Sequence, residues 1–457
     1  MADPEMHRRL GVVNATSINM SNMIGTGPFI TIAGAEGILS TMQGPQALVG
    51  WMVGAIIALA DGLVVAELGA ALPVAGGNYV YLREGFGPAR WGRLMSFLFV
   101  WQFLFSGPLE IATGNIGLVQ YLGYFWPGMT PLGTKLAAAT VGGVALVCLY
   151  RKITDVARLM MGLWITMLLT VGWVISAGVI NFSAGLAFDF PPDAFRFGLG
   201  FVRGLGAGTL IVMYNYLGYY QVCYLGAEIK NPARTIPYAV VISVLGVALI
   251  NILISLSFIG VVPWREALQT TAIGSVFMER LYGKWAAGLL SAMIMVTAFS
   301  SVYALMLGYS RIPYAAAKDG TFFKFLGALH PRGEFPHRSL LLVGGLCIVA
   351  SFFSLGAVIS ALMTARILVE FLGRVIAAVI IRRERPEIHR PFRMWLYPLP
   401  AILSLAGYTY VFGASGFKFI LYGLITLAAG VVIYFVTARR QGDWPFEKAS
   451  KVPAVAS

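Results

Sequence analysis

Apolar stretches of about 20 residues recur from Gly11 to Val436, and short segments that carry Pro, Gly, Arg or Lys separate them. A helix needs roughly that length of apolar sequence to cross the hydrocarbon core of a bilayer. The mean hydropathy of +0.77 and the charged share of 12% exclude an ordinary soluble domain. We therefore predict an all-α membrane protein with about twelve transmembrane helices.

The predicted spans form one transmembrane domain, residues 1–437, which a tail of residues 438–457 follows. The segment 264–283, between the seventh and eighth spans, is mildly amphipathic, so we expect short helices over the outer face, where a lid can sit. From the positions of the apolar runs, the spans are expected at residues 11–33, 45–71, 91–123, 135–150, 157–180, 199–227, 237–262, 284–312, 338–354, 357–381, 395–413 and 417–437.

The net charge of +13 could indicate a nucleic-acid partner, but the positions of the basic residues indicate a membrane topology instead. If the N-terminus is cytoplasmic and the spans alternate, most of the 33 Lys and Arg residues fall on the cytoplasmic side, as the positive-inside rule requires. We therefore expect a multi-pass protein of the cytoplasmic membrane, in contact with the lipid bilayer, with both termini cytoplasmic. The exceptions are Lys135, Arg196, Arg203, Arg265, Arg280, Lys284 and Lys418 outside, and Arg366 and Arg374 within a span.

Several classes of function lack their usual sequence signals. The cysteines lie within apolar stretches without metal-ligand spacing, and the histidines fall in predicted cytoplasmic segments rather than in the spans. No G-x-x-x-x-G-K-[ST] loop indicates ATP drive, and no filter-like repeat indicates a channel. We expect neither an enzyme nor a bound metal or cofactor. The residues concerned are Cys148, Cys223, Cys347, His7, His330, His337 and His389.

Two spans carry helix-breaking sequence: MIGTGPF, residues 23–29, in the first and MYNYLGYY, residues 213–220, in the sixth. Unpaired backbone groups in hydrocarbon cost several kcal/mol each, so breaks persist where protein, water or a ligand satisfies them. Paired breaks in two halves of a chain therefore indicate a transporter site. The alternative is that small residues allow close helix packing. Pro28, suited to begin a second half-helix, favours a break in the first span.

Four further segments resemble signatures of the amino acid–polyamine–organocation superfamily of transporters, in the same order along the chain. They are AELGAALPVAGGNYVYLREGFG (66–87), GAEIKNPARTIPYAV (226–240), SRIPYAAAKDGTFFKFLGALHP (310–331) and RRERPEIHRPFRMWLYPLP (382–400). The resemblance implies the LeuT-type fold, with two inverted five-helix repeats, a central site between broken spans one and six, and two C-terminal helices. The repeats map to residues 11–180 and 199–381, and the last two helices to residues 395–437.

The resemblance also implies how a substrate is held. Amides of the first break receive the substrate carboxylate, and backbone carbonyls of both breaks receive its amino group. This division is physically sensible, because half-helix N-termini present free N–H groups and half-helix C-termini present free C=O groups. Tyr214 corresponds to an aromatic gate, and Tyr219 or Tyr220 can line a side-chain pocket. The implied contacts are Gly25, Thr26 and Gly27 for the carboxylate, Met23, Ile24, Tyr214 and Leu217 for the amino group, and Gly218 beside them.

Ionisable residues within the spans are the remaining candidates. Glu110 and Asp61 lie at depths where a carboxylate is expensive, and each either pairs structurally or serves as a proton relay or as a counter-ion for a cationic substrate. Arg366, Glu370 and Arg374 are spaced i, i+4 and i+8, so one helical face can carry an Arg–Glu–Arg ladder that stabilises packing or a cytoplasmic gate.

The fifth span departs from the family pattern. Many proton-coupled or sodium-independent carriers have a lysine there, and Trp164 occupies the corresponding position in this chain. Sodium would need first-span carbonyls with Ser300 and Ser301 of the eighth span, but hydroxyls on membrane helices more often bond to their own backbone. We therefore do not expect a sodium site.

The sequence thus predicts a secondary transporter that moves amino acids by alternating access, with proton symport or exchange as the mode. The alternative within the same superfamily is a carrier of polyamines or other organic amines, because Glu110 could receive a second ammonium group.

Overall fold

The computed structural model describes residues 8, 10–74, 76–150, 156–331 and 335–441, and for residues 89, 156–164 and 441 it describes the backbone alone. Within these residues the chain is helical, and the one isolated bridge of extended backbone joins Leu10 to Ile229. The prediction of an all-α membrane protein is confirmed. Seven helices are long and apolar enough to cross a membrane, and three shorter apolar helices accompany them.

The helices account for all twelve predicted spans. Span one is α1 (Val12–Met23) and α2 (Gly27–Thr31), and span six is α10 (Leu199–Asn215) and α11 (Gln221–Tyr224). The other spans are α4 (Ala47–Ala71), α6 (Gly92–Phe125), α7 (Pro131–Leu149), α8 (Val156–Ile180), α12 (Pro232–Ile259), α15 (Lys284–Tyr309), α17 (His337–Ala350), α18 (Leu355–Arg366) with η5 (Ile367–Phe371) and α19 (Leu372–Glu384), α20 (Leu399–Ala414) and α21 (Phe417–Gln441).

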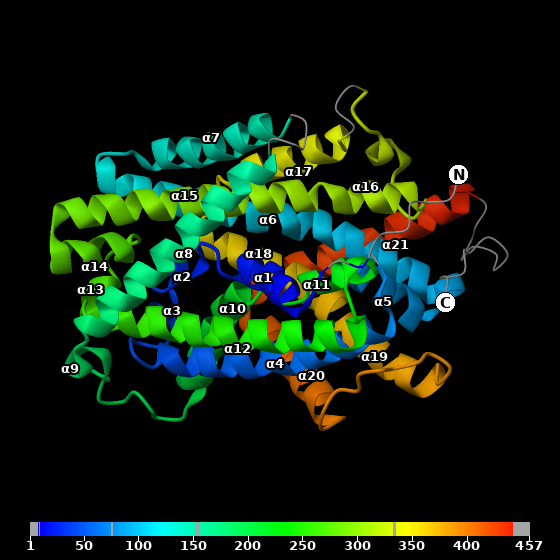
Figure 1. The fold of residues 1–457 in the computed structure, drawn as a ribbon, viewed down its shortest axis with the longest axis horizontal. Coiled ribbons are helices and arrows are strands. Elements are labelled where there is room, and N and C mark those ends of the chain that lie inside the picture. Colours follow the sequence, from blue (N-terminus) through cyan, green and yellow to red (C-terminus); the bar gives the residue numbers. More distant parts are fainter. Residues whose placement is uncertain (1–7, 9, 75, 151–155, 332–334, 442–457) are drawn as a thin grey trace.

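Short helices connect the spans at both ends of the molecule. Helices α9, α13 and α14 lie at one end, and α5, α16 and the last turns of α21 lie at the opposite end (Figure 1). The segment 264–283 does form short helices, α13 and α14, as expected, and that their end of the molecule is the outer one stays a prediction. The connecting elements are α3 (Ile38–Thr41), α5 (Asn78–Gly85), η1 (Gly87–Trp91), α9 (Ala184–Ala187), η3 (Gly226–Glu228), α13 (Trp264–Ala267), α14 (Ile273–Tyr282), α16 (Arg311–Lys318) and η4 (Lys324–Gly327).

Burial separates an inner set of helices from an outer set. In α6 the most apolar window is 72% buried, whereas the corresponding windows of α7 and α21 are 22% buried. Helix α6 packs against α15, α18, α17 and α7, and so runs through the middle of the bundle. Since apolar side chains on α7 and α21 face outward, these helices present the surface that suits lipid.

The beginning of the described chain is attached to the segment that follows span six. The N–H of Leu10 donates to the carbonyl of Glu228 at 3.0 Å, and the N–H of Lys230 donates to the carbonyl of Leu10 at 2.9 Å. These two bonds form the parallel bridge between Leu10 and Ile229. The entry to the first span and the exit from the sixth are therefore held side by side.

Candidate functional site

The first span is broken where the sequence predicts it. Helix α1 ends at Met23, Ile24 has non-helical backbone angles (φ −88°, ψ 76°), and α2 begins at Gly27 with Pro28 in its first turn. Proline fits there because the first N–H groups of a helix have no intrahelical acceptor. The break therefore leaves carbonyl groups at the end of α1 and N–H groups at the start of α2 facing the interior.

The sixth span is broken between Asn215 and Gln221, with Gly218 at φ +111°, a conformation that glycine adopts without strain. Asn19 of α1 is fully buried and satisfies backbone groups at this break. Its side-chain amide donates to the carbonyl of Tyr219 at 2.6 Å, and its carbonyl accepts from the N–H of Val222 at 2.8 Å. The first span thus supplies the hydrogen bonds that the sixth span loses.

The two breaks meet at Gly27 and Asn215. A Cβ atom on Gly27 would collide with the side-chain carbonyl oxygen of Asn215, so this approach requires glycine. The Asn215 amide nitrogen donates to the hydroxyl of Thr31 at 3.0 Å, but its carbonyl oxygen is buried without a hydrogen-bond partner among the described residues. A buried acceptor of this kind is costly unless a ligand or water satisfies it.

A small cavity lies between the breaks and holds about 40 Å³ of water-accessible space. That is room for about three water molecules, so the walls are close together. The wall opposite the breaks comes from α6 and α15, and the hydroxyl of Thr113 on α6 shares a hydrogen bond of 2.7 Å with the hydroxyl of Tyr214 on α10. The lining residues are Asn22, Met23, Gly25, Thr26, Gly27, Glu110, Thr113, Gly114, Tyr214, Asn215, Leu217, Ser301 and Leu305.

Most of the predicted substrate contacts border this cavity, and four do not. Ile24 is buried beside it, and Gly218 packs against Asn22. Tyr219 and Tyr220 lie on the far side of the sixth-span break, where the Tyr219 hydroxyl donates to Asp61 and the Tyr220 ring stands 5.1 Å from the Arg374 guanidinium. The predicted residues that do line the cavity are Met23, Gly25, Thr26, Gly27, Tyr214, Leu217, Glu110 and Ser301.

The structure places the residues considered for a sodium ion, and the residue at the position of the family's lysine, differently with respect to the cavity. Ser301 lies against the first break, since a Cβ on Gly25 would stand 2.9 Å from its hydroxyl oxygen. Ser300 does not border the cavity. The side chain of Trp164 lies outside the described residues. No group of three or more His, Cys, Asp or Glu side chains in the described chain could hold a metal ion.

Some residues that line the cavity were not predicted from the sequence, although the positions of two of them indicated a functional role. Thr113 lies one helical turn after Glu110 and so shares its face of the span. Asn215 is a polar residue at the depth of the break, and such residues are commonly functional in membranes. Asn22, Gly114 and Leu305 carry no comparable signal, because they contribute shape rather than distinctive chemistry.

Glu110 is paired rather than free. Its carboxylate accepts a hydrogen bond of 2.7 Å from the Tyr309 hydroxyl and stands 2.5 Å from the Arg366 guanidinium. The side chain of Glu110 is 8% exposed and that of Arg366 is 3% exposed. The negative charge that faces the cavity is therefore already matched by a cation.

The pairing continues through the interior as a chain of alternating charges, which we call the charge ladder: Glu110, Arg366, Glu370, Arg374 and Asp61. Arg366 lies 3.8 Å from Glu370, and Arg374 pairs with Asp61, with both side chains of that pair fully buried. Asn78 joins the middle, because it donates to Glu370 at 2.9 Å and accepts from Arg374 at 3.0 Å. The predicted Arg–Glu–Arg ladder thus extends at each end to a carboxylate of another span.

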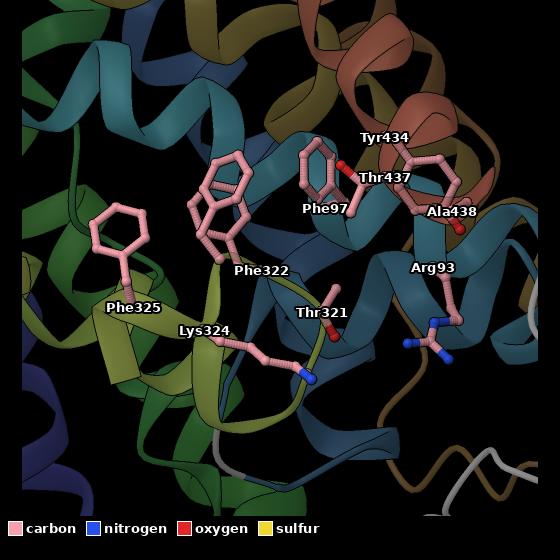
Figure 2. Close-up of a pocket in the computed structure, with 11 residues that line it drawn as sticks. Arg93, Phe97, Thr321, Phe322, Lys324, Phe325, Tyr434, Thr437 and Ala438 are labelled. Carbon is pink, nitrogen blue, oxygen red and sulfur yellow. The ribbon is translucent and has the colours of Figure 1, made fainter. Parts of the chain in front are cut away.

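A larger cavity of about 200 Å³ lies away from both breaks. It lies between the first turns of α6, the residues around η4 and the last turns of α21. Figure 2 shows the rings of Phe97, Phe322 and Tyr434 on one side and the charged ends of Arg93 and Lys324 on the other. None of the residues predicted to contact substrate borders this cavity, so the candidate site is the smaller one.

Comparisons with known proteins agree on one class. The profile of the family described as amino acid permease matches residues 10–437. The human cystine/glutamate transporter is 27% identical, covering 88% of this chain and 79% of that protein. In Bacillus subtilis, the branched-chain amino acid permease BcaP is 23% identical over 96% of this chain and 94% of its own, and the serine/threonine exchanger SteT is 26% identical over 90% and 92%.

Proposed function

This chain belongs to the amino acid permease family and is a multi-pass membrane protein that transports amino acids; from that premise we propose a secondary transporter that works by alternating access. The cavity between the two breaks is the substrate site, around which one group of helices rocks against the other. The observation that carries this proposal is the meeting of α2 and α10 at a cavity with free backbone groups from both breaks.

In the proposed binding mode the substrate's carboxylate lies at Gly25, Thr26 and Gly27, before the first turn of α2. N–H groups at that position have no intrahelical acceptor and carry the positive end of the helix dipole. The ammonium group lies at the carbonyls of Met23 and Leu217, with the unpaired carbonyl oxygen of Asn215 as a further acceptor. A zwitterion satisfies both sets of groups at once.

The pairing of Glu110 favours an amino acid over a polyamine. A diamine needs a second anionic partner, and the Glu110 carboxylate is already held by Arg366 and Tyr309. The remaining cavity side chains are neutral, and the space is narrow. We propose a small neutral α-amino acid as the substrate class.

A binding screen tests this substrate class. Amino acids at saturating concentration should raise the melting temperature of the purified protein, because a ligand that binds the folded state stabilises it by RT ln(1 + [L]/Kd). At 100 times Kd that is about 2.7 kcal/mol. Putrescine and spermidine serve as the comparison. Stabilisation by the amines with none from any α-amino acid would reject the proposal.

The mode of coupling is proposed as exchange or proton symport, in the cytoplasmic membrane with both termini in the cytoplasm. The name of SteT describes an exchanger, which supports exchange. A buried carboxylate at the cavity, Glu110, supports proton movement. In proteoliposomes an exchanger takes up labelled substrate when amino acid is preloaded inside, whereas a symporter responds to an imposed proton gradient without preloading. Uptake that depends on sodium alone would contradict both modes.

A further inference from the structure

The charge ladder contains three carboxyl groups and two guanidinium groups, all of them buried. If every member were ionised, the ladder would carry one net negative charge inside the bilayer. An unmatched charge at that depth costs several kcal/mol, which a carboxyl group avoids by keeping its proton. The count therefore raises the question of which of the three acids is neutral.

Neighbouring elements supply no further cation to balance the count among the described residues. Besides Arg366, Arg374 and Glu110, the ionisable groups that face Glu370 are the phenols of Tyr220 at the sixth-span break, of Tyr224 at the end of α11 and of Tyr408 on α20. A phenol is neutral near neutral pH and cannot offset a negative charge. Asn78 of α5 contributes dipoles only.

The three acids differ in how firmly their ionised forms are held. Asp61 accepts from Arg374, from the Tyr219 hydroxyl and from the Ser404 hydroxyl. Glu110 has the Arg366 guanidinium at 2.5 Å and the Tyr309 hydroxyl at 2.7 Å. The nearest guanidinium nitrogen to Glu370 stands 3.8 Å away, and its hydrogen-bond partners, the Asn78 amide and the Tyr220 hydroxyl, are both neutral. Glu370 is therefore the acid with the weakest cationic partner.

We propose that Glu370 carries a proton in the state seen here, so that the charge ladder is neutral as a whole. Arg366 then neutralises the carboxylate of Glu110, and Arg374 neutralises the carboxylate of Asp61. Loss of the Glu370 proton would place Arg366 between two carboxylates and weaken its hold on Glu110 at the cavity. In this way the protonation of Glu370 is linked to the substrate site. The protonation itself is independent of the proposed function, whereas the part of this proton in coupling rests on that function.

Infrared spectroscopy tests where the proton is. Near neutral pH the purified protein should show the carbonyl band of a buried protonated carboxyl group, and isotope-labelled glutamate should shift that band. The band should persist in Glu110→Asp and move to the range of aspartic acid in Glu370→Asp. Absence of the band in the unmodified protein, or its movement in Glu110→Asp instead, would overturn the assignment.

Thermal unfolding gives an independent test, because glutamine has the shape and the neutrality of a protonated glutamic acid. Glu370→Gln should therefore melt within a few degrees of the unmodified protein near neutral pH, whereas Asp61→Asn, which strands Arg374, should melt far lower. Equal large losses of melting temperature in both variants would overturn the proposal.

Measurements of amino acid uptake then test whether the proton on Glu370 takes part in coupling, separately from whether it is present. Glu370→Gln should lose the pH dependence of amino acid uptake while it still binds substrate. If the infrared band and the melting temperatures behave as expected and the pH dependence of uptake persists, the proton on Glu370 stands and its proposed part in coupling fails. If neither the unmodified protein nor any variant takes up amino acids, the transport proposal fails. The infrared result still decides whether Glu370 is protonated.

Discussion

Single residues decide whether the two broken spans can approach each other. Gly27 is the clearest case, because any side chain there would meet the Asn215 amide that borders the cavity. The oxygen of the same amide is buried and has no hydrogen-bond partner in the described part of the chain, and a bound ammonium group would satisfy it. The close contact between Gly27 and Asn215 therefore lies at the centre of the proposed site.

Gly27→Ala should reduce amino acid uptake by at least about tenfold, equivalent to ~1.4 kcal/mol, because the methyl group forces α2 away from α10. Uptake into proteoliposomes at equal amounts of folded protein measures this. Gly413→Ala is the matched control, since a Cβ there meets no atom of the described residues within 4 Å. Equal uptake by Gly27→Ala and the unmodified protein would show that the contact with Asn215 is dispensable.

At this scale the sequence predicted part of the candidate site. Gly25, Thr26 and Gly27 were recognisable because a Gly-Thr-Gly-Pro run inside an apolar span has few explanations. The direction of Tyr219 was not recognisable, since it depends on the positive φ of Gly218, which turns the chain toward Asp61. The partners of Glu110 were likewise hidden, because Tyr309 and Arg366 are close to it only in space.

Among the elements, the broken spans depend on each other for their stability. The break in span six exposes the carbonyl of Tyr219 and the N–H of Val222, and one side chain of α1, that of Asn19, binds both. Hydropathy predicts the spans and their approximate ends, but it cannot show which helix supplies the hydrogen bonds that a broken span lacks. The π-helical turn η5, which interrupts span ten and contains Glu370, also has no signal in the pattern of apolar residues.

Asn19→Ala should lower the free energy of unfolding by about 1–3 kcal/mol for each buried group that loses its partner. Thermal unfolding in detergent measures the loss. Asn14→Ala on the same helix is the control, because Asn14 is exposed and its replacement leaves the break intact. A melting temperature for Asn19→Ala that matches the control would contradict the bracing role of this side chain.

The whole molecule has two ends of different character, and the proposed topology assigns them to opposite sides of the membrane. The end with α9, α13 and α14 is assigned to the outside, and the end with α5, α16 and the last turns of α21 to the cytoplasm (Figure 1). The sequence supports this assignment through the distribution of Lys and Arg alone, a signal that acts over the entire chain.

Cysteine labelling checks the topology. On intact cells a membrane-impermeant maleimide should label Gly128→Cys, which is exposed between α6 and α7, and should not label Lys318→Cys, which is exposed at the end of α16. Lys318→Cys should react once the cells are opened. The reverse pattern would place the termini outside.

The parallel bridge at Leu10 also works as a mechanical link. If the inner half of span six swings outward, the two N–H···O bonds between Leu10 and the segment that follows this span must either break or move Leu10 with it. A dye attached at Arg8 would consequently change its surroundings with each opening of that half, so a label at this position can report the working cycle.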